Sequence, residues 1–505
     1  MTMRIRVDWR ASLNLTGTVL KYLALPLSFP LALAVYYREP LAPFLATIAL
    51  TLVVGALFER FESDTDLGPR EAFLMVALAW LLVALVGAVP FLLAGRGTIA
   101  HPVNAAFESM SGLTTTGATV LRSFDIHARS IMMWRQLIQW LGGLGILILV
   151  TAVLSRLSVG GAQLMETETQ YENVDRLTPR IRDTARLILR LYAGLTVAAI
   201  VVLYVLGLSG LAPNMDLYNA VAHAFTSVST AGFSPEPRSV EAFAPIVQWA
   251  LIPFMFLGST SFVLMYFVLR GDVARLRESE EFQFYLGTVL VFSALVFTIL
   301  MLKKNPTGDG LNDTVRQSLF NVVSIITTTG YANADFNQWS PFAKHLLLMC
   351  MFLGGMAGST TCSIKSLRWL VIFKAFSRDL FTSIHPGAVR PIRLSGTPID
   401  EETIRDIYSY TLVAIVGVFL VTVVIVVDGA RSGLYNIGGF DEFDALGAAA
   451  STFLNIGPAF GPAGPYGTYD VFSMTTKTAM VIWMWIGRIE IIPVLVLLTP
   501  SFWRS

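Results

Sequence analysis

A short motif that ends in glycine occurs four times along the 505 residues, each time between two apolar segments. The four glycines are Gly117, Gly232, Gly330 and Gly457. Each copy has a hydroxyl residue six positions before its glycine, namely Ser111, Thr226, Ser324 and Ser451. Peptide carbonyls and hydroxyls can replace the water that a cation loses when it enters a narrow pore. Four such loops in one apolar chain therefore predict a ring of oxygen ligands around a cation path.

We expect the glycine and the two residues before it to supply these oxygens in each copy. The predicted set is Thr115, Thr116, Gly117, Thr230, Ala231, Gly232, Thr328, Thr329, Gly330, Asn455, Ile456 and Gly457. Glycine allows backbone angles that other residues avoid, so successive carbonyls can point the same way. One copy alone would more readily be an ordinary turn with capping hydroxyls, but four copies in register favour the ion-binding interpretation.

A half-helix is expected to precede each loop and to begin near a polar residue thirteen positions before the glycine. These polar residues are Asn104, Asn219, Gln317 and Asp444. The C-terminal end of a helix carries a partial negative charge, so four helices aimed at one axis would attract a cation and repel an anion.

The composition is that of a polytopic membrane protein. Hydrophobic residues make up 54% of the chain and charged residues only 14%, whereas soluble proteins carry about 25% charged residues. The net charge of +1 gives no indication of nucleic-acid binding. The two cysteines, Cys350 and Cys362, lie in or beside apolar segments and are interpreted as small space-filling residues.

The apolar runs predict ten membrane spans, since a helix needs about 20 apolar residues to cross the hydrocarbon core. The expected spans are 22–37, 41–58, 72–94, 131–155, 187–209, 246–269, 284–302, 343–375, 408–428 and 476–499. The last eight, taken in consecutive pairs, each enclose one glycine-ended motif. This pattern predicts an all-α polytopic membrane protein with four pseudo-symmetric helix–pore loop–helix repeats around one pore, preceded by a two-helix N-terminal hairpin. Lys and Arg concentrate in the segments that this topology places inside, which predicts a multi-pass protein of the cell membrane with both termini cytoplasmic.

The expected boundaries follow from this pairing. They are an N-terminal hairpin at 1–65, repeat 1 at 66–175 with its filter loop at 104–120, repeat 2 at 176–280 with its loop at 217–235, repeat 3 at 281–395 with its loop at 313–333, and repeat 4 at 396–505 with its loop at 444–462. Two long polar inner stretches, 156–190 and 376–407, are either solvated linkers or a docking surface for a cytosolic partner.

Span 343–375 is too long for one crossing and is interrupted by small and hydroxyl residues at 354–363. The candidate gate residues in this segment are Gly354, Gly355, Gly358, Ser359, Thr360 and Thr361. Such residues weaken a helix and allow it to break. The alternative is close packing against a neighbouring helix, because Gly354 and Gly358 are four residues apart.

Two basic residues lie at unusual depths. Lys365 directly follows the interrupted segment, where it would act at the gate or extend to the inner membrane surface. Arg488 lies inside the last apolar run, where a charge costs on the order of 3 kcal/mol. We expect Arg488 to face the pore below the loops and to oppose cations in a closed state; the alternative is an ion pair with another repeat. Glu490 is not expected to pair with Arg488, because residues two apart on a helix do not face each other.

The remaining polar residues carry less information. Eight acidic residues are expected on outer loops, where they could concentrate cations: Glu108, Asp125, Glu236, Glu241, Asp335, Asp441, Glu442 and Asp470. His223 is interpreted as a packing residue, and the glycines at 142, 143 and 145 as sites of close helix packing. The sequence contains no phosphate-binding loop, which predicts that this chain binds no nucleotide cofactor of its own.

With these motifs the chain resembles the Trk/Ktr/HKT superfamily of potassium transporters, and within it the TrkH type, over nearly its whole length. The resemblance implies that the four glycines line one potassium pathway, with Gly117 favouring potassium over sodium. It implies that segment 354–363 is an intramembrane gate and that an arginine at the position of Arg488 contributes to it. The fourth loop departs from the threonine-rich pattern, which implies only approximate fourfold symmetry.

The resemblance also implies partners: a homodimer in the lipid bilayer, and a cytosolic TrkA-type regulatory ring that would carry the nucleotide. The expected function is potassium-selective conduction into the cell, with proton- or sodium-coupled potassium symport as the alternative. No acidic residue near the loops favours coupling, and no nucleophile–base or metal constellation favours an enzyme.

Overall fold

Long apolar helices connected by short loops make up nearly all of the computed structural model, which describes residues 7–61, 68–149, 181–436 and 439–503. β structure in the described residues is limited to a two-stranded antiparallel ribbon of β1 (Arg393–Leu394) and β2 (Thr397–Pro398). The predicted inner stretch 156–190 lies mostly outside the described residues. Stretch 376–407 contains the end of one helix, this ribbon and the start of the next helix.

The N-terminal region is a helical hairpin whose first arm consists of two helices in nearly continuous succession. Its helices are α1 (Trp9–Tyr22), α2 (Ala24–Tyr37) and α3 (Ala42–Phe58). Gly17 and Gly55 let α1 and α3 approach closely, because a Cβ atom on either glycine would lie 2.7 Å from the carbonyl oxygen of the other. The first membrane segment therefore extends from Trp9 to Tyr37, well beyond the predicted 22–37.

The next two groups of helices each place a short, buried helix between longer ones. The first group comprises α4 (Pro69–Gly87), α5 (Val89–Ala94), α6 (Pro102–Leu113) and α7 (Arg129–Leu149). The second comprises α9 (Ile181–Leu208), α10 (Leu217–Val228), α11 (Pro245–Gly258) and α12 (Phe262–Leu269).

The two C-terminal groups follow the same order. The third comprises α13 (Arg275–Glu278), α14 (Glu280–Lys303), α15 (Gly310–Ile326), α16 (Pro341–Met351) and α17 (Ser366–Ile384). The fourth comprises α18 (Glu401–Ser432), α19 (Glu442–Phe453), α20 (Met474–Arg488), α21 (Ile492–Leu497) and α22 (Pro500–Trp503). Short 3-10 turns are found at Thr98–Ala100, Ser239–Ala242, Phe336–Gln338, Leu434–Asn436, Gly461–Ala463 and Tyr469–Val471.

Six helical segments of the described residues are long and apolar enough to cross a membrane, and a bent pair of helices makes a seventh. The six are Trp9–Tyr37, Arg70–Ala94, Arg129–Ile148, Thr184–Leu208, Glu280–Lys303 and Glu401–Ser432. Two of the ten predicted spans, 246–269 and 476–499, therefore contain a break that was not expected, whereas the break in 343–375 was expected. The apolar runs at 246–269, 343–375 and 476–499 are each divided by a break in the helix, and Ala42–Phe58 is a 17-residue helix.

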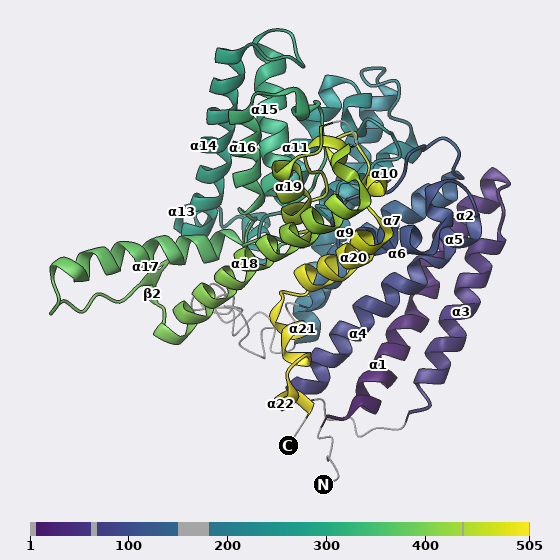
Figure 1. The fold of residues 1–505 in the computed structure, drawn as a ribbon, viewed down its shortest axis with the longest axis horizontal. Helices are drawn as coiled ribbons and strands as arrows, with labels where there is room; N and C mark the ends of the chain where they lie inside the picture. The colour runs from purple at the N-terminus through teal and green to yellow at the C-terminus, as the bar shows by residue number, and fades with distance from the viewer. Residues whose placement is uncertain (1–6, 62–67, 150–180, 437–438, 504–505) are drawn as a thin grey trace.

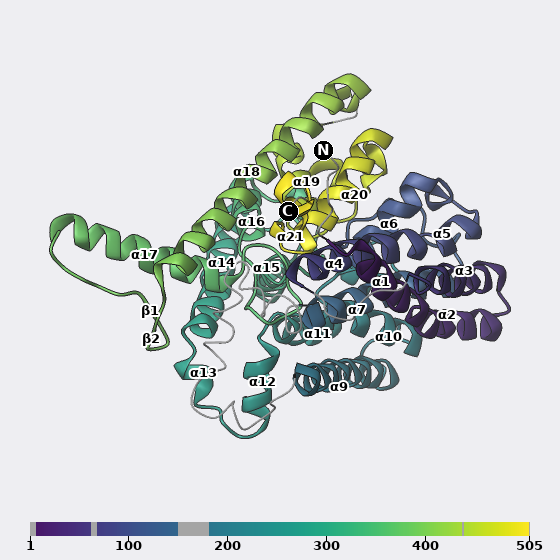
Figure 2. The same cartoon turned by 90° about the horizontal axis from the view of Figure 1, so that it is seen from below.

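Both ends of the described chain lie at the same end of the molecule (Figure 1). Val7 packs in one cluster with Leu74 and Phe502, which fixes the start of α1 beside α22. Helix α17 departs from the bundle and projects sideways in both views (Figures 1 and 2). The start of α18 returns along it, so these two helices extend away from the packed centre.

Candidate functional site

The four helices that precede the glycine-ended motifs all end at the same position relative to the glycine. Helices α6, α10, α15 and α19 end four residues before it, at Leu113, Val228, Ile326 and Phe453. The residues between each helix end and its glycine are named loop 1 (114–117), loop 2 (229–232), loop 3 (327–330) and loop 4 (454–457). Equal helix ends mean that the four loops start from equivalent places.

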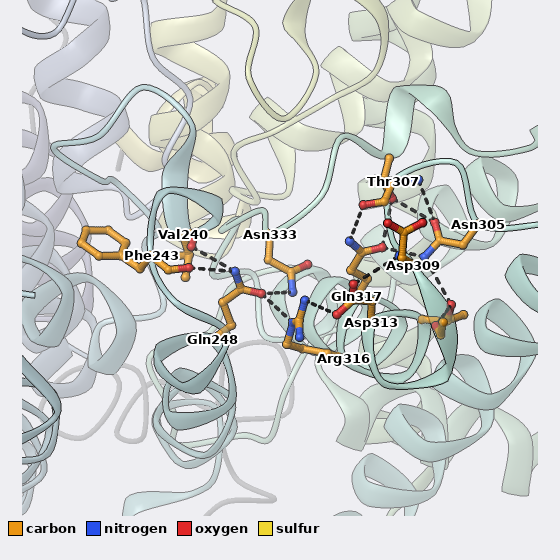
Figure 3. A network of polar contacts seen from close by, with 12 residues as sticks. Val240, Phe243, Gln248, Asn305, Thr307, Asp309, Asp313, Arg316, Gln317 and Asn333 are labelled. Carbon is orange, nitrogen blue, oxygen red and sulfur yellow. Dashed lines mark hydrogen bonds and ion pairs between the residues drawn. The ribbon is translucent and has the colours of Figure 1, made fainter. Parts of the chain in front are cut away.

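The predicted helix starts are right for α6, α10 and α19 and wrong for α15. Helices α6, α10 and α19 start two residues before the polar residue of the motif. Helix α15 starts at Gly310, seven residues before Gln317. The reason is that Gln317 holds the preceding loop instead of starting the helix. Its amide donates to the Thr307 carbonyl at 2.9 Å and its Oε1 accepts from Asn305 at 2.7 Å (Figure 3).

The backbone follows one path in all four loops. The second residue before each glycine has a positive φ, with values of 52°, 50°, 52° and 57° for Thr115, Thr230, Thr328 and Asn455. The glycines follow with φ of 81°, 75°, 79° and 110°. A positive φ is an outlier for a β-branched residue such as threonine, so three of these four loops hold a strained residue at the same place.

The hydroxyl residue of the motif begins a conserved pattern of hydrogen bonds within each loop. Its carbonyl accepts from the backbone N–H of the residue before the glycine at 2.8–2.9 Å, in the pairs Thr116–Ser111, Ala231–Thr226, Thr329–Ser324 and Ile456–Ser451. In loops 1, 3 and 4 its hydroxyl also donates to a carbonyl just after or at the glycine, with acceptors Ala118, Tyr331 and Gly457. Thr226 instead bonds to the Tyr331 hydroxyl. The motif hydroxyl therefore ties the far side of the loop back to its helix.

The four loops meet and close a ring. A Cβ atom built on each glycine would collide with the carbonyl oxygen of the residue before the glycine in another loop. The contacts are Gly117 with Ala231, Gly232 with Thr329, Gly330 with Ile456, and Gly457 with Thr116. This order runs through loops 1, 2, 3 and 4 and returns to loop 1. The structure thus brings the four glycines and the four residues before them into one ring of contacts and leaves no space for a side chain at any of the four glycines.

A cavity of about 300 Å³ lies against this ring, and all four glycines line it. Its wall contains one acidic residue, Glu236, together with Arg122 and Arg135. Burial raises the pKa of Glu236 above its usual value, and the neighbouring Asp125 and Asp216 add to the shift. In the described part of the chain, this cavity gives access to the ring from the side of residues 118–124 and 233–239.

The prediction of a set of cation-gathering outer acids needs correction. Glu108 is not on an outer loop: it is 0% exposed in α6, where its carboxylate accepts from Val120 N, Thr119 Oγ1 and Arg135 Nε. Asp470 is held by Arg122 and Lys477. Of the eight predicted acids, only Glu236 lines the cavity. Glu108 and Asp470 instead hold the backbone around the loops in place.

Polar side chains from the neighbouring helices connect adjacent loops, and the sequence analysis did not single them out. Gln248 of α11 accepts from Arg316 Nε and Asn333 Nδ2, both at 2.9 Å, which joins the region after loop 2 to that after loop 3 (Figure 3). The side chain of Asn337 exchanges two hydrogen bonds with the backbone of Gly461, joining the regions after loops 3 and 4. A polar residue inside an apolar run was the available signal for Gln248.

The predicted gate segment is a buried, non-helical loop between α16 and α17. Gly354 N donates to Ile364 O at 2.8 Å and Ser366 N to Gly355 O at 3.0 Å, so the segment leaves and rejoins the helical path at nearly one point. Its tip reaches the ring. Thr360 Oγ1 lies 2.9 Å from Thr230 Oγ1 of loop 2, and Cys362 N donates to Thr328 Oγ1 of loop 3 at 3.1 Å.

Arg488 lies directly against this segment. It is 1% exposed, and its guanidinium donates to the carbonyls of Thr360 and Gly142 at 3.0 Å each and to Cys362 Sγ. No carboxylate in the described part of the chain pairs with Arg488. The alternative, an ion pair between Arg488 and another repeat, is therefore wrong for the described residues. Glu490 does not pair with Arg488, as expected.

The carboxylate nearest to Arg488 in the chain, Glu490, pairs with two other basic residues. Glu490 accepts from Lys365 at 3.3 Å and from Arg368. The side chain of Lys365 is only 7% exposed, so it does not extend to a membrane surface, and that alternative is wrong. Arg368 was missed by the sequence analysis, although its place three residues after Lys365 on a helical pattern was a usable signal.

The second membrane helix is broken in the second, third and fourth groups, whereas α7 of the first group is continuous to Leu149. Helices α11 and α12 are bent by 106° at residues 259–261, and the gate segment fills this bend through Met356 N to Ser259 O, Thr360 N to Gly258 O and Phe262 N to Gly358 O. Helix α20 ends at Arg488 and restarts at Ile492. The sequence analysis predicted neither of these two breaks, although Gly258, Ser259, Thr260 and Ser261 have the same small and hydroxyl-bearing character as segment 354–363.

Three of these second helices use a glycine to pack on the end of a preceding helix. A Cβ atom on Gly142, Gly258 or Gly487 would contact the carbonyl of Leu113, Val228 or Phe453, respectively. The predicted close packing at Gly142 is therefore confirmed. His223 is also a packing residue as expected: it is buried, packs edge-to-face against Phe243 and bonds to Ser234 Oγ at 3.1 Å.

Comparison with known proteins gives a consistent result over the whole chain. The sequence model of the TrkH family, described as cation transport protein, matches residues 42–308 and 284–505. The chain is 31% identical over 505 residues to the Trk system potassium uptake protein TrkH of Escherichia coli K12, covering 99% of this chain and 100% of that one. It is 32% identical to TrkI of Halomonas elongata, covering 98% and 97%. The crystal structure of the potassium transporter TrkH from Vibrio parahaemolyticus superposes with a TM-score of 0.85 at 29% identity, covering 99% of this chain and 100% of that one.

Proposed function

Because this chain belongs to the TrkH family of cation transport proteins, we propose that it conducts potassium into the cell through one pore formed by loops 1–4. This proposal rests on one observation: each of the four glycines contacts the next loop, and the fourth contacts the first, so the four loops form a closed ring. The four loops share a positive φ two residues before the glycine and one backbone hydrogen bond, which supports equivalent oxygens around a common centre. Such a ring can replace the hydration shell of an alkali cation.

The proposed potassium ligands are the twelve predicted residues, with the carbonyl oxygens as the main donors. The helices before the loops end at equal distances from the glycines, so their partly negative ends converge on the same place. Potassium as the cation is supported by the names of the similar proteins, which are potassium uptake proteins. Potassium is here the transported ion, and the chain needs no other cofactor for this role.

The architecture that we propose is four pseudo-symmetric repeats around the pore, with the N-terminal hairpin at their periphery. The repeats occupy 66–175, 176–280, 281–395 and 396–505. The repeated order of a long helix, a short buried helix, a loop and a second helix supports these boundaries. The chain would lie in the cell membrane with both termini cytoplasmic, which agrees with the packing of Val7 against Phe502 at one end.

The gate that we propose is segment 354–363 together with Lys365 and Arg488. The segment lies across the inner side of loops 2 and 3, and Arg488 places a positive charge beside it. Its neighbours in the described chain include no carboxylate within ion-pair distance, so the charge remains effective against a cation in this arrangement. Opening requires the segment to leave Thr230 and Thr328.

The name of the relatives, Trk system protein, supports a membrane subunit that works with other components. We therefore propose a homodimer with one pore in each subunit and a cytosolic TrkA-type ring that binds the nucleotide and acts on the gate. Nothing in the proposed pore requires a nucleotide on this chain.

The test is ion flux in proteoliposomes that contain the purified chain, with and without an imposed proton or sodium gradient. Conduction predicts rubidium or potassium flux that follows the potassium gradient alone. Flux that strictly requires a proton or sodium gradient would instead establish a coupled symporter. Absence of potassium flux in folded protein that retains its partner would contradict the proposal.

A further inference from the structure

Gln139, on α7, binds the backbone of loop 2 on both sides of its glycine. Its Nε2 donates to Ala231 O at 2.7 Å, and its Oε1 accepts from Phe233 N at 3.0 Å. The side chain is 0% exposed. A carboxamide supplies one donor and one acceptor at its tip, so a single glutamine satisfies both peptide groups flanking Gly232.

The oxygen that Gln139 binds is one of the four that face the glycines around the ring. The other three belong to Thr116, Thr329 and Ile456. Within the described residues, none of those three carbonyls accepts a hydrogen bond, whereas the Ala231 carbonyl does. One oxygen of the ring is thus positioned by a side chain from outside its own loop.

Loops 2 and 4 both lack a side-chain hydrogen bond that is found inside loops 1 and 3. In loops 1 and 3, the threonine before the glycine bonds through its hydroxyl to another threonine two residues earlier, at 2.7 Å in both cases. The residue before the glycine is Ala231 in loop 2 and Ile456 in loop 4, and neither side chain has a hydroxyl. Gln139 supplies from α7 the restraint that the threonines supply inside loops 1 and 3.

Helix α7 is itself held firmly at this level. Arg135, one turn away from Gln139, donates through Nη1 to Ser234 O at 2.8 Å and through Nε to the carboxylate of Glu108. Two successive turns of α7 therefore form hydrogen bonds with the backbone of residues 231–234. A side chain on so fixed a helix can hold a carbonyl to within a small tolerance.

We propose that Gln139 is a positioning residue that sets the preference of the pore for potassium over sodium. This inference rests on the proposed potassium conduction. A smaller cation needs the ring oxygens to move inward or to present a stronger field. The hydrogen bond from Gln139 prevents the Ala231 oxygen from moving inward. It also weakens the field of this oxygen at the ion, because one of the two lone pairs accepts from the amide. Both effects favour the larger ion.

The experiment measures the ratio of potassium to sodium permeability in proteoliposomes of the full chain. Gln139→Leu removes both hydrogen bonds, and we expect the ratio to fall about fivefold to tenfold while potassium flux continues, an effect comparable to one buried hydrogen bond. The matched control is Gln136→Leu on the same helix. Gln136 is equally buried, and in the described chain its amide has no hydrogen-bond partner, so the ratio should stay at the wild-type value.

Gln139→Glu separates positioning from general structural damage within one sample. With its carboxyl protonated, the new side chain can still donate to Ala231 O and accept from Phe233 N; when ionised it cannot donate. We expect the permeability ratio to be near wild type at low pH and to fall as pH rises through the titration of this carboxyl. Wild-type protein in the same pH series controls for the titratable and charged neighbours Glu108, Arg135 and His223.

The outcomes are distinct for the two proposals. Wild-type protein without potassium preference would overturn the proposed function. Wild-type preference combined with an unchanged ratio in Gln139→Leu would overturn only the role of Gln139. If Gln139→Leu does not fold, the Gln139→Glu vesicles decide, and a ratio that does not depend on pH overturns the inference.

Discussion

The ring and the segments beneath it are built on opposite principles. The four loops repeat one backbone path, with the same helix end, the same positive φ and the same hydrogen bond to the backbone carbonyl of the motif's hydroxyl residue. The second helices, which continue from the ring inward, differ in every group. Helix α7 is continuous to Leu149, α11 and α12 are bent by 106°, α16 and α17 are separated by a long loop, and α20 and α21 by a short break.

The difference teaches which part of the molecule needs symmetry. Equivalent oxygens around an ion require equivalent backbone, so the ring tolerates no individual variation in its path. A gate needs one element that can adopt a second arrangement, and only one group needs to supply it. In the described chain, the third group lacks the contact with a helix end that Gly142, Gly258 and Gly487 make in the other groups. A Cβ atom on its Gly354 would instead contact the carbonyl oxygens of Cys362, in the gate segment, and of Ile364, just after it.

The largest expected effect comes from breaking the ring at a glycine. Gly232→Ala would place a Cβ atom on the carbonyl of Thr329 and impose an alanine at φ 75°. We expect rubidium uptake to fall by about a hundredfold, because backbone cannot yield as a side chain can. Gly287→Ala in α14 is the control, since a Cβ atom there has nothing within 4 Å. Near-normal uptake by folded Gly232→Ala protein would refute the requirement for a closed ring.

Removing the buried charge beneath the ring should act in the opposite direction. Arg488→Ala takes away the guanidinium that bonds to Thr360 and Gly142. We expect basal rubidium flux without a cytosolic partner to rise about tenfold, since a fixed positive charge near the path repels cations. Flux would be measured in vesicles beside thermal unfolding of the same preparation. Unchanged flux at unchanged stability would count against Arg488 as part of the gate.

A smaller change should follow from loosening the gate segment alone. Thr360→Val keeps the size of the side chain but loses the hydroxyl that contacts Thr230 and donates to Gly258 O. Loss of a hydrogen bond of about 1 kcal/mol corresponds to roughly a fivefold shift toward the open arrangement. Thr298→Val is a control, because Thr298 is exposed in α14 and bonds only within its own helix. Basal flux that does not change in Thr360→Val would show that this contact does not hold the segment closed.

The smallest effect is expected in the cavity outside the ring. Glu236→Gln removes the only acidic side chain among the described residues that line this cavity. We expect about a twofold to threefold loss of uptake at low potassium, with little change at saturating potassium, because a carboxylate raises the local cation concentration. The pKa of Glu236 is raised, so wild-type uptake should decline as pH falls through a range above that of an ordinary glutamate. A decline of the same size in Glu236→Gln would assign it to another group.

The ring could be predicted from the sequence because its elements are local and repeated. Backbone geometry at a glycine, a capping hydroxyl and a helix end depend on a few neighbouring residues, and four copies made the pattern recognisable. The start of α15 was predicted wrongly because Gln317 has a tertiary role with Asn305 and Thr307 that its type does not reveal.

The segments beneath the ring were predictable only in part. Small residues at 354–363 signalled one break, but the breaks after Gly258 and Arg488 were not predicted, although residues 258–261 are also small or carry a hydroxyl. They arise from tertiary contacts, such as the backbone hydrogen bonds between the gate segment and residues 258–262. The exposure of Glu108 was misjudged for a similar reason, because its partner Arg135 is 27 residues away in the chain.

The most direct test of the ring is an experimental structure of the full chain in rubidium, with the ion located by its anomalous scattering. The account predicts rubidium on the axis of loops 1–4, in contact with carbonyl oxygens from all four of them. An ion bound by only one or two loops, or density absent from the ring in protein that transports rubidium, would contradict it.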